Sequence, residues 1–241
     1  LTVFIFVGAL RAQQQTNPYN QDEELGTVAW YRDYDAALAL SAKENKPVLI
    51  FFQEVPGCMT CRNYGHNVMS NPLLVEAIEK EFIPLAIFNN KSGADAQILK
   101  KYNEPSWNNP VVRIVNSKGD DLVRRVASDY SAKGLYDAML KALEKEGKSI
   151  PGYIKLLGKK LSLSPSHRKE RTYQLYCFWT SEKQLGSHDG VVETIAGSQG
   201  AEVVKVTFNP TDISAHQLDA NAIQHKMKPI ALGNLSWKEK F

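Results

Sequence analysis

Two cysteines, Cys58 and Cys61, form a Cys-x-x-Cys pair with the spacing of a redox-active dithiol. The pair follows an apolar run at residues 48–52 and precedes a sequence of helical character, so the first thiol is expected at a helix N-terminus. Unpaired backbone N–H groups and the positive end of the helix dipole stabilise a thiolate there. The Cys58 thiolate would attack a substrate disulfide, and Cys61 would resolve the mixed disulfide.

Two other interpretations of this pair stay open. It could be half of a zinc site, although the sequence has no second Cys-x-x-Cys and no spaced histidine pair to complete one. It could also be an inert structural disulfide, although such short loops are rarely used to staple a fold. We therefore predict a redox dithiol with no bound metal and no cofactor.

The third cysteine, Cys177, opens the sequence Cys-Phe-Trp-Thr-Ser-Glu. If a helix begins near Thr180, Glu182 lies about one turn from Cys177 and can face the same pocket. The thiol could then act as a nucleophile, and the carboxylic acid could protonate an oxygen leaving group. The alternative is a core cysteine flanked by core aromatics, because free cysteine is among the most buried residue types. The residue types alone favour the core interpretation.

Length and charge place the chain among globular proteins with one large domain or two small ones. It has 241 residues, of which 43% are hydrophobic and 23% are charged, and its net charge is +3. That charge is too weak to indicate nucleic-acid binding, which needs a basic stripe. No run of about 18 apolar residues predicts a membrane span.

The first residues have the pattern of the end of a secretory signal peptide. An apolar run at residues 1–10 is followed by a small residue, Ala12, and then by three glutamines. A buried N-terminal strand is the alternative. We predict that residues 1–12 are a signal remnant and that the mature protein is exported, to the periplasm or out of the cell. An exported protein that is stabilised by disulfides would usually carry an even number of cysteines at wider spacing. The three cysteines of this chain therefore point to redox chemistry.

Strand and helix patterns alternate around the dithiol. Strands are expected at residues 48–52, 82–88, 111–115 and 122–126, and helices at residues 33–44, from residue 71, and at residues 94–102 and 135–146. Strands that alternate with helices and close on a hairpin and a helix predict an α/β sandwich. We assign this first domain to residues 25–147.

Residues 33–146 resemble the thioredoxin-like superfamily, particularly its exported members. The resemblance rests on the Cys-x-x-Cys, on the Lys-Pro-Val-Leu-Ile lead-in at residues 46–50, and on Pro110 before an apolar strand. In that family the matching proline is cis and lies against the dithiol, which implies a substrate-binding role for Pro110. The chain departs from the family at Gly57, where a tryptophan usually stands. The strand at residues 48–52 also lacks the family's buried acidic residue.

A stretch rich in Lys, Gly, Ser and Pro predicts a linker at residues 148–170, followed by a second unit at residues 171–241. In that unit, strands are expected at residues 173–177, 191–195 and 202–208, and helices at residues 180–185 and 214–222. The predicted fold is therefore an α/β thioredoxin-like sandwich followed by a small α+β unit of the β-α-β-β type.

Residues 172–222 resemble a truncated and divergent peptide methionine sulfoxide reductase A. Cys-Phe-Trp followed by Glu matches that family's active-site motif. The segments that follow the family in order are residues 190–197, 200–210 and 213–218. The resemblance implies that Cys177 attacks the sulfoxide sulfur and that Glu182 protonates the oxygen. It further implies that Phe178 and Trp179 hold the methyl group.

The three cysteines together predict an exported thiol–disulfide oxidoreductase whose dithiol serves the attached reductase-like unit in the repair of oxidised proteins. A sulfenic acid at Cys177 has to be reduced by a thiol, and the second unit has no other cysteine. A dithiol on the same chain would be present at a high effective concentration. The expected partners are oxidised proteins or peptides and an upstream thiol reductant.

Two alternatives to this function remain. One is a general thioredoxin-like disulfide reductase whose second unit is a non-catalytic binding module. The reductase family's Tyr-Ala-Gly is Ile-Ala-Gly at residues 195–197, and this loss of an oxygen-binding tyrosine favours that alternative. The other is a folding or binding protein of the cell envelope that does not use its thiols.

Overall fold

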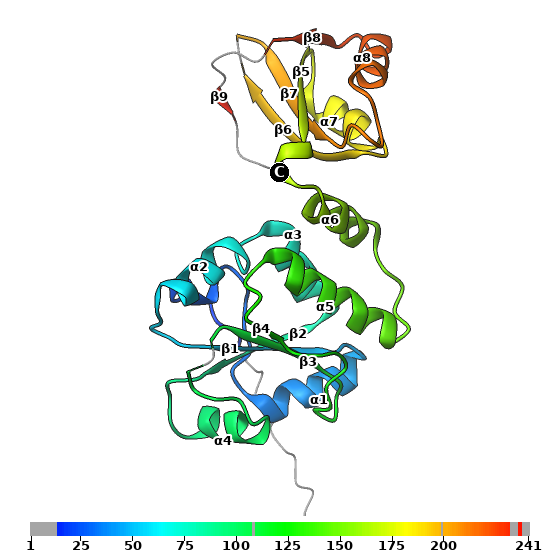
Figure 1. The fold of residues 1–241 in the computed structure, drawn as a ribbon. Helices are drawn as coiled ribbons and strands as arrows, with labels where there is room; N and C mark the ends of the chain where they lie inside the picture. The colour runs from blue at the N-terminus through cyan, green and yellow to red at the C-terminus, as the bar shows by residue number, and fades with distance from the viewer. Residues whose placement is uncertain (1–13, 108, 199, 232–235, 238–241) are drawn as a thin grey trace, which may run out of the picture. The chain divides into compact units, whose positions relative to one another are not determined.

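The chain divides into two compact units, the first ending at Ile154 and the second beginning at Lys155. The structure is a computed structural model, and it describes residues 14–107, 109–198, 200–231 and 236–237 (Figure 1). The predicted signal remnant at residues 1–12 lies outside the described residues. None of the described helices is both long and apolar enough to cross a membrane.

The first unit is built on a four-stranded sheet in the order β2-β1-β3-β4. The inner strand β1 (Val48–Gln53) runs parallel to β2 (Ile83–Phe88) and antiparallel to β3 (Val111–Val115). Every residue of β1 is buried, as expected for a strand that is covered on both faces. This strand carries the chain directly to the loop that holds the dithiol.

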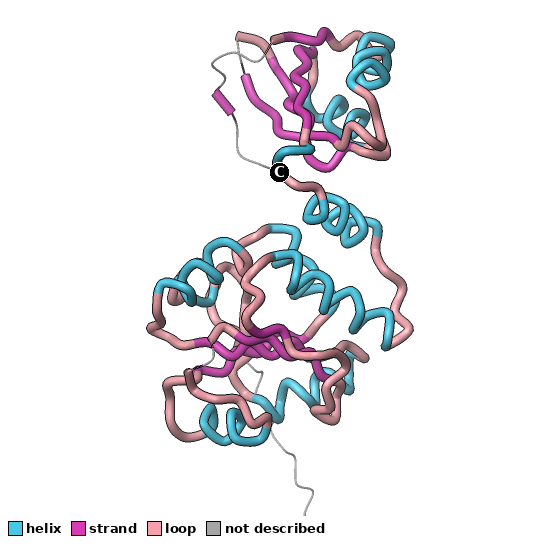
Figure 2. The backbone as a smooth tube through the Cα atoms, viewed as in Figure 1, coloured by secondary structure: helices cyan, strands magenta, loops and turns pink. Residues whose placement is uncertain are grey.

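Helices cover both faces of this sheet (Figure 2). They are η1 (Glu23–Leu25), α1 (Tyr34–Glu44), α2 (Met59–Asn67), α3 (Pro72–Glu81), α4 (Ala94–Lys101) and α5 (Ala132–Lys145). Side-chain caps fix the start of three helices, α1, α3 and α5. Asp33, Asn71 and Ser131 each accept a backbone N–H from the first turn of the helix that they cap. The predicted α/β sandwich is confirmed.

The partner strand predicted at residues 122–126 is wrong in extent. The observed strand, β4 (Val126–Ala127), has only two residues, although Leu122 N still donates to the carbonyl of Ile114 at 2.9 Å. The intervening segment is held by side chains instead. Lys145 Nζ donates to the Leu122 carbonyl at 2.7 Å, and Arg125 pairs with Glu104 at 2.8 Å.

The segment predicted as a linker, residues 148–170, contains a helix, α6 (Gly152–Ser162), and a 3-10 turn, η2 (Pro165–His167). The segment is rich in Gly, Lys and Ser, as a linker would be, but it also has apolar residues at helical spacing. Ile154 and Leu157 are 2% and 0% exposed, so α6 has a fully buried face. The boundary between the two compact units falls inside this helix.

The second unit has a five-stranded sheet in the order β8-β5-β7-β6-β9, with antiparallel pairing between all neighbours. Its elements are β5 (Lys169–Leu175), α7 (Phe178–Gly186), β6 (Val191–Ser198), β7 (Glu202–Phe208), α8 (Ala215–Gln224), β8 (Lys228–Ile230) and β9 (Ser236–Trp237). From β5 to β8 this is a β-α-β-β-α-β arrangement, in which β7 lies between the parallel strands β5 and β6. The predicted α+β class is confirmed, and the short strands β8 and β9 were not predicted.

Candidate active site

The dithiol lies at the N-terminus of α2. Cys58 is the N-cap residue of this helix, with extended backbone angles, and Cys61 lies in its first turn. The two sulfur atoms are 3.5 Å apart, and both thiols are free. The helix therefore begins between the two thiols and places them side by side.

The two thiols differ in environment although they are three residues apart. Cys58 is exposed, and Cys61 is fully buried. A hydrogen bond from the backbone N–H of Cys61 is the main cause that lowers the pKa of Cys58. Burial raises the pKa of Cys61 to about 12, and its hydrogen bond with Cys58 adds to this shift. This asymmetry suits Cys58 for attack and Cys61 for resolution.

Two buried polar side chains support the loop in front of the dithiol. Glu24, which is 3% exposed and comes from η1, accepts the N–H of Gly57 at 2.7 Å through its Oε1. Gln53 ends β1 and is fully buried, and its Nε2 donates to the carbonyls of Glu24 and Cys61 at 3.1 and 3.2 Å. These hydrogen bonds tie η1, β1 and α2 into one rigid support.

Neither supporting residue was predicted from the sequence. Gln53 gave a usable signal, because it is a polar residue that directly continues a fully apolar run. Glu24 gave none, since it lies more than thirty residues before the dithiol in a polar segment. The family's acidic residue in β1 is missing, as noted, but Glu24 supplies a buried carboxylate to the same loop from another element.

Gly57 explains why this chain lacks a tryptophan before its first cysteine. A Cβ atom at this position would lie 2.4 Å from the carbonyl oxygen of Glu54 and 2.7 Å from the Cβ of Cys61. It would also lie 3.1 Å from the Cys61 sulfur. The loop is folded so tightly against Cys61 that only glycine fits.

Glu54 is the third ionisable group at the dithiol. One of its carboxylate oxygens and the sulfurs of Cys58 and Cys61 all lie within 4.8 Å of one another. Among the described residues, these three form the group of cysteine and carboxylate side chains that could hold a metal ion. From the sequence no metal was expected here, and Glu54 was not among the predicted site residues.

Pro110 is buried directly before β3, and the peptide bond that precedes it, Asn109–Pro110, is cis. β3 is the antiparallel neighbour of β1, the strand that leads to the dithiol. The substrate-binding role of Pro110 stays a prediction.

The predicted residues of the second unit gather at the N-terminus of α7. Cys177 is the half-buried N-cap of this helix, and Phe178 is its first residue. Glu182 lies half-buried on the same helix, and Trp179 is 74% exposed, so Trp179 is not a core aromatic. No hydrogen bond in the described part of the chain joins the Cys177 thiol to the Glu182 carboxylate. The structure thus places the motif in the N-terminal half of α7, with no hydrogen bond among the described residues between its two reactive groups.

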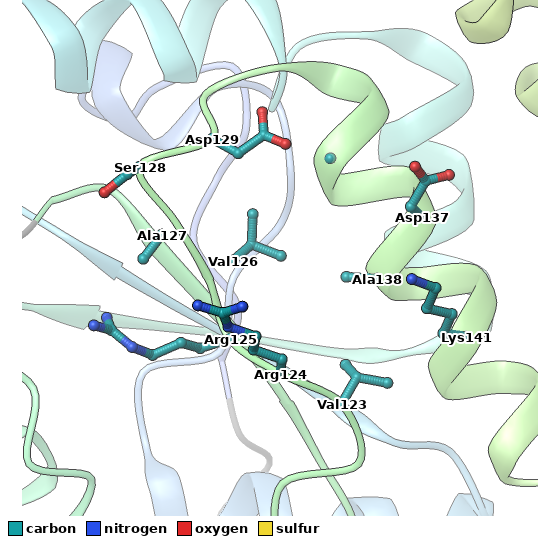
Figure 3. Close-up of a pocket in the computed structure, with 11 residues that line it drawn as sticks. Val123, Arg124, Arg125, Val126, Ala127, Ser128, Asp129, Asp137, Ala138 and Lys141 are labelled. Carbon is teal, nitrogen blue, oxygen red and sulfur yellow. The ribbon is translucent and has the colours of Figure 1, made fainter.

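A separate cavity of about 520 Å³ lies between the β4 segment and α5 (Figure 3). Its lining mixes charges of both signs, with Arg124 and Lys141 opposed by Asp129 and Asp137. It contains no cysteine, so it offers no nucleophile for thiol chemistry.

The fold and the dithiol define the first unit as a thioredoxin-like domain with a Cys-x-x-Cys pair. Residues 29–117 match a family model described as thioredoxin-like, which is less than half of the chain. No curated protein matches the chain. The match lies within the first unit, and the resemblance of the second unit to methionine sulfoxide reductase A stays a prediction.

Three solved structures are similar to about half of this chain. One is titled DsbH oxidoreductase, with 16% identity over 52% of this chain and 91% of that chain, and a TM-score of 0.42. Another is a thioredoxin from Thermus thermophilus, with 17% identity over 50% of this chain and 90% of that chain, and a TM-score of 0.40. The third is a disulphide isomerase from Xylella fastidiosa Temecula1, with 22% identity over 52% of this chain and 86% of that chain, and a TM-score of 0.33.

The close packing at Gly57 predicts the effect of a single methyl group. Gly57→Ala should lower the free energy of unfolding by about 1–3 kcal/mol, because the added Cβ overpacks the loop against Cys61. The matched control is Gly152→Ala in α6, where an added Cβ meets no atom within 4 Å. Urea unfolding followed by tryptophan fluorescence measures both. Equal stability of the two variants would contradict the packing described for Gly57.

The opposite pKa shifts of the two thiols predict selective alkylation. The thiolate is the reactive form, so a lowered pKa increases reaction at a given pH and a raised pKa suppresses it. With iodoacetamide at pH 7, Cys58 should be modified at least about tenfold faster than Cys61, which should stay unmodified up to about pH 9. Mass spectrometry of tryptic peptides, in a Cys177→Ser background, measures both rates. Equal labelling of Cys58 and Cys61 would refute the assignment of nucleophile and resolving thiol.

Proposed function

We propose that the protein is a thiol–disulfide oxidoreductase that acts on disulfides of proteins or peptides. The observation that carries the proposal is the pair of thiols at one helix N-terminus, one exposed with a lowered pKa and one buried with a raised pKa. Cys58 is the nucleophile and Cys61 is the resolving thiol. Pro110, at the start of β3, is the residue we expect beside the bound peptide.

The reaction transfers two electrons from the dithiol to the substrate. The Cys58 thiolate attacks one sulfur of the substrate disulfide, which breaks and releases a thiolate that takes up a proton. The mixed disulfide removes the negative charge from the Cys58 sulfur. Cys61 then loses its proton and attacks that sulfur, which forms the Cys58–Cys61 disulfide and frees the second substrate thiol. An upstream thiol reductant would return the dithiol to its reduced form.

The proposed site of action is outside the cytoplasm, in the periplasm or the extracellular space. This part of the proposal is supported by the signal-like pattern of residues 1–12. Expression of the full gene, followed by a protease-accessibility assay on cells whose outer envelope has been permeabilised, would test it. A chain that stays protected from external protease after permeabilisation of the outer envelope would count against export.

Reduction of insulin by the full chain tests the disulfide chemistry. Cys58→Ser should abolish turnover, and Cys61→Ser should accumulate a mixed disulfide between Cys58 and substrate, because nothing resolves it. His66→Ala, which changes an exposed residue of the same helix, is the matched control and should keep the wild-type rate. Failure of the wild-type chain to reduce insulin would instead support a folding or binding protein that does not use its thiols.

A second activity is proposed for the unit that follows, reduction of methionine sulfoxide. The observation that favours it is the position of Cys177 as the N-cap of α7, two residues after the end of β5, with Glu182 on the same helix. Cys177 would attack the sulfoxide sulfur, Glu182 would protonate the oxygen, and Phe178 and Trp179 would hold the methyl group. The products are methionine and a Cys177 sulfenic acid.

The dithiol would reduce this sulfenic acid. A Cys58 thiol condenses with it, releases water and forms a Cys58–Cys177 disulfide. Cys61 then attacks the Cys58 sulfur, which regenerates the Cys177 thiol and leaves the Cys58–Cys61 disulfide. Two electrons therefore pass from the dithiol to the sulfoxide.

A single turnover tests this second activity. The fully reduced chain, freed of reductant, should convert a peptide methionine S-sulfoxide to methionine and lose two thiols for each methionine formed. Cys177→Ser should abolish the reaction, and mass spectrometry follows both products. If no methionine forms while insulin is still reduced, the second unit is a non-catalytic binding module.

A further inference from the structure

Glu54, Cys58 and Cys61 bring together three side chains that ligate metals. One Glu54 carboxylate oxygen and both sulfurs lie within 4.8 Å of one another, and the sulfurs are 3.5 Å apart. We propose that the reduced chain binds one zinc ion through Cys58, Cys61 and Glu54. The inference goes beyond the proposed redox function and requires only that both thiols are reduced.

The separations suit a tetrahedral zinc centre. Zinc–sulfur bonds of about 2.3 Å and zinc–oxygen bonds of about 2.0 Å place ligand atoms about 3.5–3.8 Å apart. The sulfurs, at 3.5 Å, would have to separate by only about 0.3 Å. The carboxylate oxygen is already within side-chain reach of both. Three protein ligands leave a fourth position for water or for a further ligand.

The electrostatics of the helix terminus favour this centre. Two thiolates and one carboxylate around a divalent zinc ion leave one net negative charge, which the positive end of the α2 dipole stabilises. In the described part of the chain, Glu54 takes part in no ion pair. The neighbouring carboxylate, Glu24, is already engaged by the Gly57 N–H and lies 3.7 Å from Arg62. Glu54 is therefore the carboxylate that is available to a metal.

The mixed ligand set selects zinc among common ions. Magnesium and calcium prefer oxygen ligands throughout. Copper(I) is selected by sets of soft sulfur ligands, to which a carboxylate adds little. Zinc accepts both cysteine sulfur and glutamate oxygen in one site.

Zinc binding would change protonation and leave the oxidation state unchanged. Cys58 and Cys61 bind as thiolates, with any thiol protons released to solvent, and two zinc–sulfur bonds and one zinc–oxygen bond to Glu54 replace bonds from zinc to water. The bound ion occupies both sulfurs and so blocks their attack on a disulfide. The oxidised pair has a sulfur–sulfur bond in place of two thiolates and cannot hold the ion. Zinc would therefore bind only to the reduced chain and would inhibit its reduction of disulfides.

Titration of the full chain with zinc chloride, in competition with a chromophoric chelator and without oxygen, tests the site. The reduced chain should bind one zinc ion and the oxidised chain none. Glu54→Gln, which keeps the size of the side chain, should weaken binding about tenfold or more through loss of one ligand. Glu76→Gln, which changes an exposed carboxylate on α3, is the matched control and should bind like the wild type.

Wild-type affinity in Glu54→Gln would overturn the proposal, because the dithiol alone would then account for binding. Failure of the reduced chain to bind zinc would overturn it as well. X-ray absorption of the wild-type zinc complex gives a test that does not depend on the variant. It should show two sulfur and two lighter ligands, and any other sulfur count contradicts the site. Insulin reduction by the metal-free chain is measured separately, so the redox function and the zinc site can fail independently.

Discussion

The hydrogen bond from the Gly57 N–H to the buried Glu24 carboxylate holds the loop on which the dithiol depends. A buried carboxylate is costly unless hydrogen bonds and a counter-charge compensate it. Here the Gly57 N–H, at 2.7 Å, and Arg62, at 3.7 Å, supply that compensation. Removing either group would leave Glu24 poorly satisfied, so the loop has one favoured position. That position keeps Gly57 against Cys61 and leaves Cys58 at the start of the helix.

One turn of helix then produces two thiols of different character. Cys58 precedes the first turn, is exposed to solvent and receives backbone N–H groups. Cys61 lies within that turn, is fully buried, and its carbonyl accepts Gln53 from β1. The shifts in opposite directions follow from this placement, because a helix terminus stabilises a thiolate and burial disfavours one. This difference suits Cys58 for attack on a substrate disulfide and Cys61 for release of the substrate from the mixed disulfide.

The parts of the site that were predicted are those encoded in consecutive residues. The Cys-x-x-Cys and the buried strand before it share one short stretch of chain, so their relation could be inferred from periodicity and spacing alone. Glu24 could not be predicted, because its burial depends on a contact with a loop more than thirty residues away. The position of Glu54 beside both sulfurs likewise depends on how tightly the loop folds at Gly57.

The same distinction applies to the fold. Long apolar strands and capped helices were predicted close to their observed bounds, as at β1 and at α1 with its Asp33 cap. The short extent of β4 was not predicted, because Lys145 and Glu104 hold the segment before it through tertiary contacts. The helix α6 was hidden by a composition that is typical of linkers, although Ile154 and Leu157 are buried at helical spacing.

Equilibration of the chain with glutathione buffers of graded redox ratio tests whether Cys58 and Cys61 form a redox-active pair. We expect one reversible two-electron transition, in which Cys58 and Cys61 form an intramolecular disulfide at the same glutathione ratio from the reduced and the oxidised side. Peptide mapping of acid-quenched samples would identify that disulfide. Thiols that stay free in the most oxidising buffer, or that form only mixed disulfides with glutathione, would contradict the assignment of this pair as a redox dithiol.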